Sequence, residues 1–139
     1  MDKPSSNDSD KNMSKPGRTG ASRVAWATYY SYRGIKSAWI NEAAFRQELA
    51  FMVILLPLAF WLGENGLQRA VLIAPCFLVV IVELINSAIE AVVDRIGPER
   101  HELSGQAKDM GSAAVFFALC LVVITWSLVA WDRFSHLLN

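Results

Sequence analysis

The chain of 139 residues is long enough for about one domain, and its 13 basic and 13 acidic residues leave no net charge. This balance excludes a polybasic nucleic-acid binder as the default, and no nucleic-acid partner is expected. Hydrophobic residues make up 53% of the chain against 19% charged, which indicates a membrane protein.

The N-terminal part of the chain divides into a polar tail and an aromatic segment. Residues 1–20 contain no aromatic residue and no Val, Ile or Leu, so they cannot bury enough apolar surface to offset their ordering entropy, which predicts a disordered cytoplasmic tail. Residues of about 22–41 mix tyrosines and tryptophans with Arg33 and Lys36, which favours an amphipathic helix in the headgroup layer. The alternative is an ordinary amphipathic helix packed on protein.

Three apolar runs follow and predict membrane spans of about 45–62, 70–93 and 111–131. The uncharged core of the first, residues 49–62, covers only roughly 21 Å of a hydrocarbon layer about 30 Å thick. That span must therefore begin earlier or be a core helix. The third run has no charge from Ser112 to Trp131 and lacks the polar face of a soluble bundle. The expected fold is an all-α membrane protein, an interfacial helix plus a bundle of three transmembrane helices, with residues 21–139 as one membrane domain.

Basic residues predict the orientation of these spans. Eleven of the thirteen Lys and Arg residues lie before the first span or between the second and third spans. Because cytoplasmic loops are enriched in Lys and Arg, the N-terminus and the second loop are expected in the cytoplasm.

The second run carries a polar stripe. Asn86, Glu90 and Asp94 follow Glu83 at i+3, i+7 and i+11, which places all four on one side of a helix. An ionisable residue such as Glu83 inside the bilayer is costly, and function is its default explanation. The structural alternative is a set of interhelical hydrogen bonds that holds the bundle together.

The predicted topology brings further charged residues to the cytoplasmic ends of the spans: Glu42, Glu48, Glu90, Asp94, Lys108 and Asp109. Carboxylates from different helices suit Mg²⁺ bound together with nucleotide phosphates, and Lys108 would supply a positive charge to those phosphates. Glu83 lies roughly 10 Å deeper than Glu90, where it could reach a lipid hydroxyl. The alternatives are a small proton-coupled transporter, with Glu83 as its proton carrier, and a structural scaffold. The transporter does not explain why Asn86 and Glu90 lie on the same side of the helix as Glu83.

These residues lie in three segments that closely resemble the bacterial integral-membrane diacylglycerol kinases: AWINEAAFRQE (38–48), VELINSAIEAVVDRIG (82–97) and HELSGQAKDMGSAAV (101–115). The resemblance covers about Arg23 to Trp131, and the pattern E-x-x-N-x-x-x-E followed by AKD is highly specific. The motif NEAAFRQE looks more like the diacylglycerol kinases than the undecaprenol kinases of the same fold, which remain an alternative. Gln106 stands where a basic residue is more familiar, and the tail is longer than usual.

The resemblance implies a homotrimer in the bacterial inner membrane that uses ATP and Mg²⁺ to phosphorylate the primary hydroxyl of diacylglycerol, giving phosphatidic acid. It implies Glu83 as catalytic base, with Glu42 and Glu90 as metal ligands. The ATP contacts that it implies are Arg23, Tyr30, Glu42, Glu90, Glu99, Arg100, His101, Lys108 and Asp109. The lipid contacts that it implies are Arg23, Trp39, Gln47, Glu48, Glu83, Asn86, Ser112 and Trp126.

Overall fold

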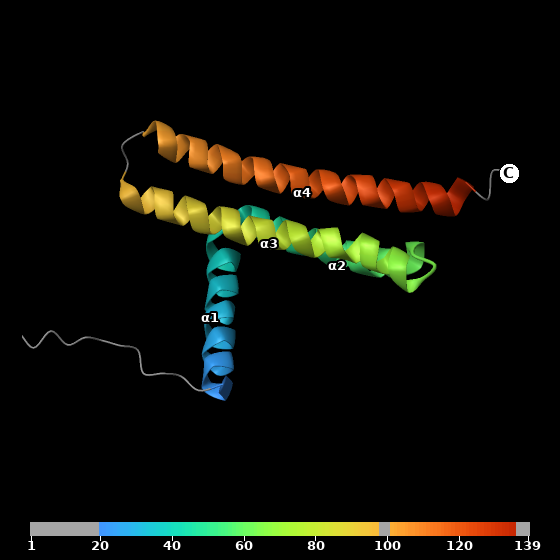
Figure 1. The fold of residues 1–139 in the computed structure, drawn as a ribbon, viewed down its shortest axis with the longest axis horizontal. Helices are drawn as coiled ribbons and strands as arrows, with labels where there is room; N and C mark the ends of the chain where they lie inside the picture. The colour runs from blue at the N-terminus through green and yellow to red at the C-terminus, as the bar shows by residue number, and fades with distance from the viewer. Residues whose placement is uncertain (1–19, 98–100, 136–139) are drawn as a thin grey trace, which may run out of the picture. The chain divides into compact units, whose positions relative to one another are not determined.

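The protein is described by a computed structural model that covers residues 20–97 and 101–135 (Figure 1). Within these residues the chain is all helical, with α1 (Gly20–Asn41), α2 (Ala43–Leu62), α3 (Gly66–Ile96) and α4 (Glu102–Ser135). The all-α class and the helix predicted at about 22–41 are confirmed. The predicted tail lies, apart from Gly20, outside the described residues.

Helices α2, α3 and α4 are each long and apolar enough to cross a membrane, which confirms the three predicted spans. The first span begins at Ala43 and runs through Pro57, so its 20 residues cover roughly 30 Å, the thickness of the hydrocarbon layer. The 34 residues of α4 start well before the predicted span, because good helix formers between Glu102 and Met110 continue the helix beyond the apolar run.

A short, capped turn joins α2 to α3. Between α2 and α3, the backbone N–H of Gln68 donates to Asn65 Oδ1 (2.9 Å), and the N–H of Glu64 donates to Gln68 Oε1 (2.8 Å). The first bond satisfies a donor in the first turn of α3 that has no partner inside the helix, and the second ties the residue before the N-cap to the same turn. The other end of α3 stops at Gly97, whose φ of +147° is accessible to glycine and costly for other residues.

Helix α3 is the centre of the packing, since it lies against both α4 and α2 while α2 and α4 touch little (Figure 1). A small core forms near the α2–α3 turn, where Ala59, Leu62, Leu72 and Val129 are buried together. Arg133 of α4 donates from Nη1 to the carbonyls of Trp61 (2.9 Å) and Leu62 (2.8 Å) at the end of α2. Buried apolar contacts and hydrogen bonds thus join the three spans at the end where the α2–α3 turn lies.

Large apolar side chains cover the outside of the spans. Val53, Phe117 and Leu128 are exposed by 72%, 70% and 64%, and many neighbours on the same helices are similar. So many exposed apolar side chains are expected to be covered by lipid or by another protein copy, in agreement with a membrane protein.

The chain from residue 20 to Gly34 forms a unit of its own. The rings of Trp26, Tyr29 and Tyr30 cluster there with centroids 5.7–5.9 Å apart, and the guanidinium of Arg33 lies 5.8 Å from the Tyr29 ring. This mixture of aromatic and basic groups suits a membrane surface. The position of the segment in the headgroup layer stays a prediction.

Candidate active site

Two polar side chains are buried among the described residues, and both lie in the middle of α3. Glu83 is 4% exposed and Asn86 is 8% exposed. On the same helix, Ile81 and Ile85 are more than half exposed. The buried side of α3 is apolar from Leu72 to Val79 and becomes polar at Glu83 and Asn86. The carboxylate of Glu83 is therefore held inside the protein at a level of α3 where the exposed side chains are apolar.

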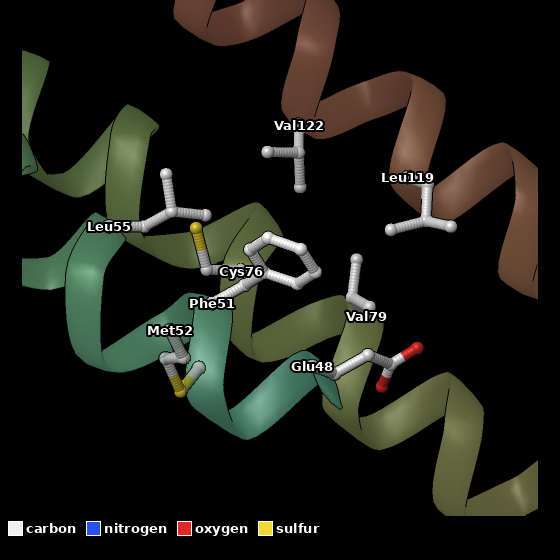
Figure 2. A pocket seen from close by; sticks show the side chains of 8 residues that line it. All are labelled: Glu48, Phe51, Met52, Leu55, Cys76, Val79, Leu119 and Val122. Atoms are coloured by element: carbon white, nitrogen blue, oxygen red, sulfur yellow. The ribbon is translucent and has the colours of Figure 1, made fainter. Parts of the chain in front are cut away.

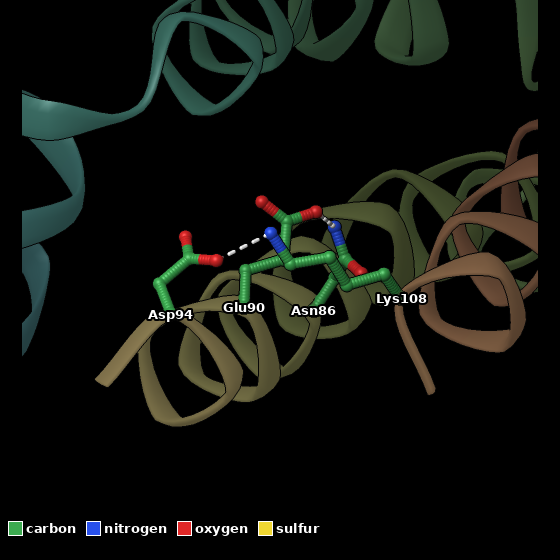
Figure 3. A network of polar contacts seen from close by, with 4 residues as sticks. All are labelled: Asn86, Glu90, Asp94 and Lys108. Atoms are coloured by element: carbon green, nitrogen blue, oxygen red, sulfur yellow. Dashed lines mark hydrogen bonds and ion pairs between the residues drawn. The ribbon is translucent and has the colours of Figure 1, made fainter. Parts of the chain in front are cut away.

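Asn86 links the buried part of the stripe to Glu90. Its Nδ2 donates to Glu90 Oε1 at 3.1 Å (Figure 3). Its Oδ1 is buried and has no hydrogen-bond partner among the described residues. Across the helix interface lies Gly111 of α4, and a Cβ added to that glycine would collide with Asn86 Oδ1. The amide of Asn86 thus occupies space that only a glycine at position 111 leaves open.

The exposed end of the stripe pairs with α4. Lys108 Nζ lies 2.6 Å from Asp94 Oδ1, and Figure 3 shows the lysine reaching from α4 toward the carboxylate on α3. The two side chains are 37% and 66% exposed. Asp94 was placed on the stripe by its spacing, but no role followed from the sequence. Its role as the partner of Lys108 becomes visible only in the structure.

Three carboxylates lie around that of Glu83. Glu42 and Glu90 are close enough to act on Glu83 by charge repulsion, and Glu83 acts in the same way on Glu48. Glu42 comes directly before α2 and makes no capping bond there, while Glu48 lies in the second turn of that helix. The structure therefore brings together, within one chain, carboxylates of two helices that the sequence placed at one level.

The oxygen atoms of this cluster fit a magnesium ion that is shared with a nucleotide. No group of three His, Cys, Asp or Glu side chains in residues 20–97 and 101–135 forms a ready-made metal site. Mg²⁺, however, usually takes one or two carboxylates and keeps water and substrate phosphate oxygens as its other ligands. The half-buried Glu42 and Glu90 supply two such carboxylates.

An apolar pocket of about 120 Å³ adjoins the cluster. Glu48 lies at one end of it, and the remaining wall consists of apolar side chains and Cys76 from α2, α3 and α4 (Figure 2). Oε2 of Glu48 is buried and has no hydrogen-bond partner in the described part of the chain. The pocket therefore combines one carboxylate with a surface that suits hydrocarbon.

Other predicted lipid contacts are more scattered. Trp39, Gln47 and Ser112 are exposed. Trp126 donates from Nε1 to the carbonyl of Leu72 (3.1 Å), eleven residues before Glu83 and thus roughly 16 Å away along α3. Within one chain, the structure does not bring Trp126 to the carboxylates.

The predicted nucleotide contacts outside the stripe lie in several places. His101 and Asp109 are exposed near the start of α4, and Nδ1 of His101 accepts from the N–H of Leu103 (3.3 Å). Gln106 donates to Glu102 on the same helix (3.3 Å). Arg23 and Tyr30 are exposed on the separate N-terminal unit. The two remaining predicted residues, Glu99 and Arg100, lie outside the described residues.

Comparisons with known proteins add an independent line of argument. The family model described as prokaryotic diacylglycerol kinase matches residues 29–130. The diacylglycerol kinase of Escherichia coli strain K12 is 54% identical over 117 residues, which are 84% of this chain and 96% of the relative. That of Haemophilus influenzae is 55% identical over 108 residues (78% and 92%), and that of Pseudomonas aeruginosa is 52% identical over 113 residues (81% and 92%). All three relatives are named diacylglycerol kinases. These names support the predicted diacylglycerol kinase over the alternatives of an undecaprenol kinase and a transporter.

Proposed function

Because this chain belongs to the prokaryotic diacylglycerol kinase family and is a diacylglycerol kinase of the membrane, we propose that the polar stripe of α3 carries its phosphoryl transfer. In this proposal the γ-phosphoryl group of ATP passes to the primary hydroxyl of diacylglycerol, and the products are phosphatidic acid and ADP. The observation that carries the proposal is the buried Glu83, surrounded by the carboxylates of Glu42, Glu48 and Glu90.

Glu83 is the proposed general base. As the lipid oxygen bonds to the γ-phosphorus and the bond from that phosphorus to the β-phosphate oxygen breaks, the hydroxyl proton passes to a carboxylate oxygen of Glu83. Phosphoryl transfer depends mostly on positioning and charge stabilisation, so the base needs only modest strength. Its burial supports this role, because few water molecules reach a buried carboxylate and compete with the lipid hydroxyl for it.

Glu42 and Glu90 are the proposed ligands of Mg²⁺, and Asn86 orients the Glu90 carboxylate through its Nδ2. When bound, the ion neutralises phosphate charge and helps to align the γ-phosphoryl group. Lys108 adds a second positive charge to the phosphates after leaving Asp94, which is possible because both side chains reach solvent.

The proposal assigns the remaining residues by substrate. Nucleotide contacts are Arg23, Tyr30, Glu99, Arg100, His101 and Asp109, in addition to Glu42, Glu90 and Lys108. Lipid contacts are Trp39, Gln47, Glu48, Asn86, Ser112 and Trp126, in addition to Arg23 and Glu83. The pocket beside Glu48 supports the lipid assignment, since it joins a carboxylate to an apolar wall.

Assembly and orientation belong to the same proposal. We infer a homotrimer in the bacterial inner membrane, with the N-terminus, a cytoplasmic tail at 1–20 and the open end of the stripe in the cytoplasm, and with residues 21–139 as one membrane domain. The enrichment of Lys and Arg on that side supports this orientation. The exposed apolar faces of the spans offer surface for neighbouring copies.

The test is transfer of labelled phosphate from ATP to diacylglycerol in mixed micelles by the purified full chain. Glu83→Gln removes the base with little change in volume, and Glu64→Gln, at an exposed position in the α2–α3 turn, is the matched control. We expect Glu83→Gln to lose almost all activity and Glu64→Gln to retain it. If Glu83→Gln keeps more than about a tenth of the wild-type kcat, a loss under ~1.4 kcal/mol, Glu83 is not the base.

A further inference from the structure

We propose that Gly111 of α4 is a positioning residue for phosphoryl transfer, because its missing side chain fixes the orientation of the Asn86 amide. The inference rests on the proposed role of Glu90, to which that amide donates. It concerns a residue that contacts neither the nucleotide nor the lipid in the proposed function.

The atoms nearest to the open side of Gly111 all belong to the side chain of Asn86. Gly111 is buried, whereas Ser112, Ala113 and Ala114 after it are exposed. The three heavy atoms nearest to a Cβ added at position 111 are Oδ1, Cγ and Cβ of Asn86, and the first of them would overlap with it. By contrast, a Cβ added at Gly105, also on α4, would meet nothing within 4 Å. A methyl group at position 111 therefore strikes Asn86 before anything else.

The two ends of the amide have unequal surroundings. Oδ1 is buried without a hydrogen-bond partner in the described residues, and it lies where a Cβ of residue 111 would be. The Cα hydrogen of Gly111 in that direction points at Oδ1, a weak contact that recurs at helix–helix interfaces. Nδ2 consequently turns toward Glu90 and donates to Oε1 (3.1 Å).

The reverse orientation of the amide is unfavourable at Glu90. It would place the amide oxygen against a carboxylate oxygen, with no proton between the two acceptors. If a methyl group pushed Oδ1 out of its space, Asn86 would have to rotate or α4 would have to move away from α3. Rotation of Asn86 breaks the bond to Glu90, and the carboxylate then loses the donor that orients it. A displaced α4 alone would leave this bond within α3 intact.

A stability cycle tests whether Gly111 acts through Asn86. The variants are Gly111→Ala, Asn86→Ala and their combination in the full-length protein, with Gly105→Ala as the matched control. We expect Gly111→Ala to lower the thermal midpoint when Asn86 is present and to leave it unchanged or higher when residue 86 is alanine. Gly105→Ala should lower it in neither chain, since alanine favours a helix over glycine.

The same cycle remains informative if Gly111→Ala does not fold. Recovery of folding on adding Asn86→Ala supports the proposal, because the collision partner has been removed. Equal losses in both backgrounds, or failure of the combined variant to fold, would overturn it, because residue 111 would then clash with something other than Asn86.

Kinetics test the effect on the reaction. Gly111→Ala should lower kcat at least tenfold and raise the Mg²⁺ concentration for half-maximal activity, with the KM for diacylglycerol within twofold of wild type. Asn86→Ala should show the same loss of kcat and the same rise in Mg²⁺ requirement, together with a higher KM for diacylglycerol because Asn86 is also a proposed lipid contact. The combined variant should be no worse than Asn86→Ala alone. A purely structural defect would not move the metal dependence selectively.

The outcomes separate this proposal from the proposed function. Normal metal dependence in Gly111→Ala but not in Asn86→Ala overturns the role of Gly111 alone. Normal metal dependence in both variants means that the bond from Asn86 does not orient Glu90 for the metal, and this inference fails, whereas the proposed metal site stands or falls with Glu90→Gln.

Discussion

The ion pair between Lys108 and Asp94 gives a quantitative prediction for nucleotide binding. If Lys108 must leave Asp94 to meet a phosphate, the free energy of the pair opposes ATP binding. The two side chains are 37% and 66% exposed, and a solvent-screened ion pair of this kind shifts an equilibrium by only about 1.4- to 5-fold. Asp94→Asn should therefore lower the KM for ATP by about that factor.

The assay is the initial rate of lipid phosphorylation against ATP concentration, at saturating Mg²⁺ and diacylglycerol. We expect kcat to change little, because Lys108 contacts the phosphates in both proteins once ATP is bound. The gain in affinity should shrink at high salt, where exposed charges are screened. Glu102→Gln, which removes an exposed charge on α4 that bonds only to Gln106 in the described residues, is the control.

Two results would refute this reasoning. A higher KM for ATP in Asp94→Asn would mean that Asp94 holds Lys108 in its working position or binds the nucleotide complex itself. A lower KM that persists when Lys108→Gln is already present would mean that Asp94 acts on the phosphates directly and not through the lysine.

Three further predictions concern the metal ligands, the sharing of sites between subunits, and the hydrogen bonds from Arg133 of α4 to the end of α2. Glu42→Gln and Glu90→Gln should each raise the Mg²⁺ requirement more than the KM for lipid; unchanged metal titrations in both would remove them from the metal site. If sites are shared between subunits, mixing inactive Arg23→Ala with inactive Glu83→Gln chains should restore partial activity, whereas mixed oligomers that stay inactive at every ratio would mean that each chain builds its own site. Arg133→Ala should destabilise the protein by about 1.5–3 kcal/mol through loss of its bonds to Trp61 and Leu62, as measured by unfolding in micelles, and Arg133→Lys should recover part of this; no change would show that these bonds are not needed.

Much of the fold was predictable because its signals are local in sequence. The three apolar runs specify three spans, and the shortness of residues 49–62 required the first span to start earlier, as α2 does at Ala43. The stripe was equally accessible, since helical spacing alone puts Glu83, Asn86 and Glu90 on one side. The start of α4 was not, because hydropathy reports which part of a helix is apolar and not where the helix begins.

The pairings between helices could not be predicted. That Gly111 lies opposite Asn86, and Lys108 within 2.6 Å of Asp94, depends on the register between α3 and α4. Gly111 is followed by three further small residues that are exposed, Ser112 to Ala114, and nothing in this run itself shows that Gly111 is the buried one. A side chain's partner across an interface follows from the packing of both helices, which no single segment encodes.

The placement of Glu83 has a consequence for how the enzyme senses its lipid. Glu83 lies within a helix long and apolar enough to span a membrane, with Ile81 and Ile85 exposed beside it, so in the proposed function a diacylglycerol molecule reaches the site by lateral diffusion within the bilayer. The quantity that governs encounter is then the mole fraction of diacylglycerol among the surrounding lipids. Diluting the substrate with inert lipid should slow the reaction even when its amount per volume is constant, whereas diluting the whole suspension with buffer should not. For ATP, which arrives from water, dilution of the suspension with buffer should slow the reaction, and dilution of the substrate with inert lipid should not affect its encounter.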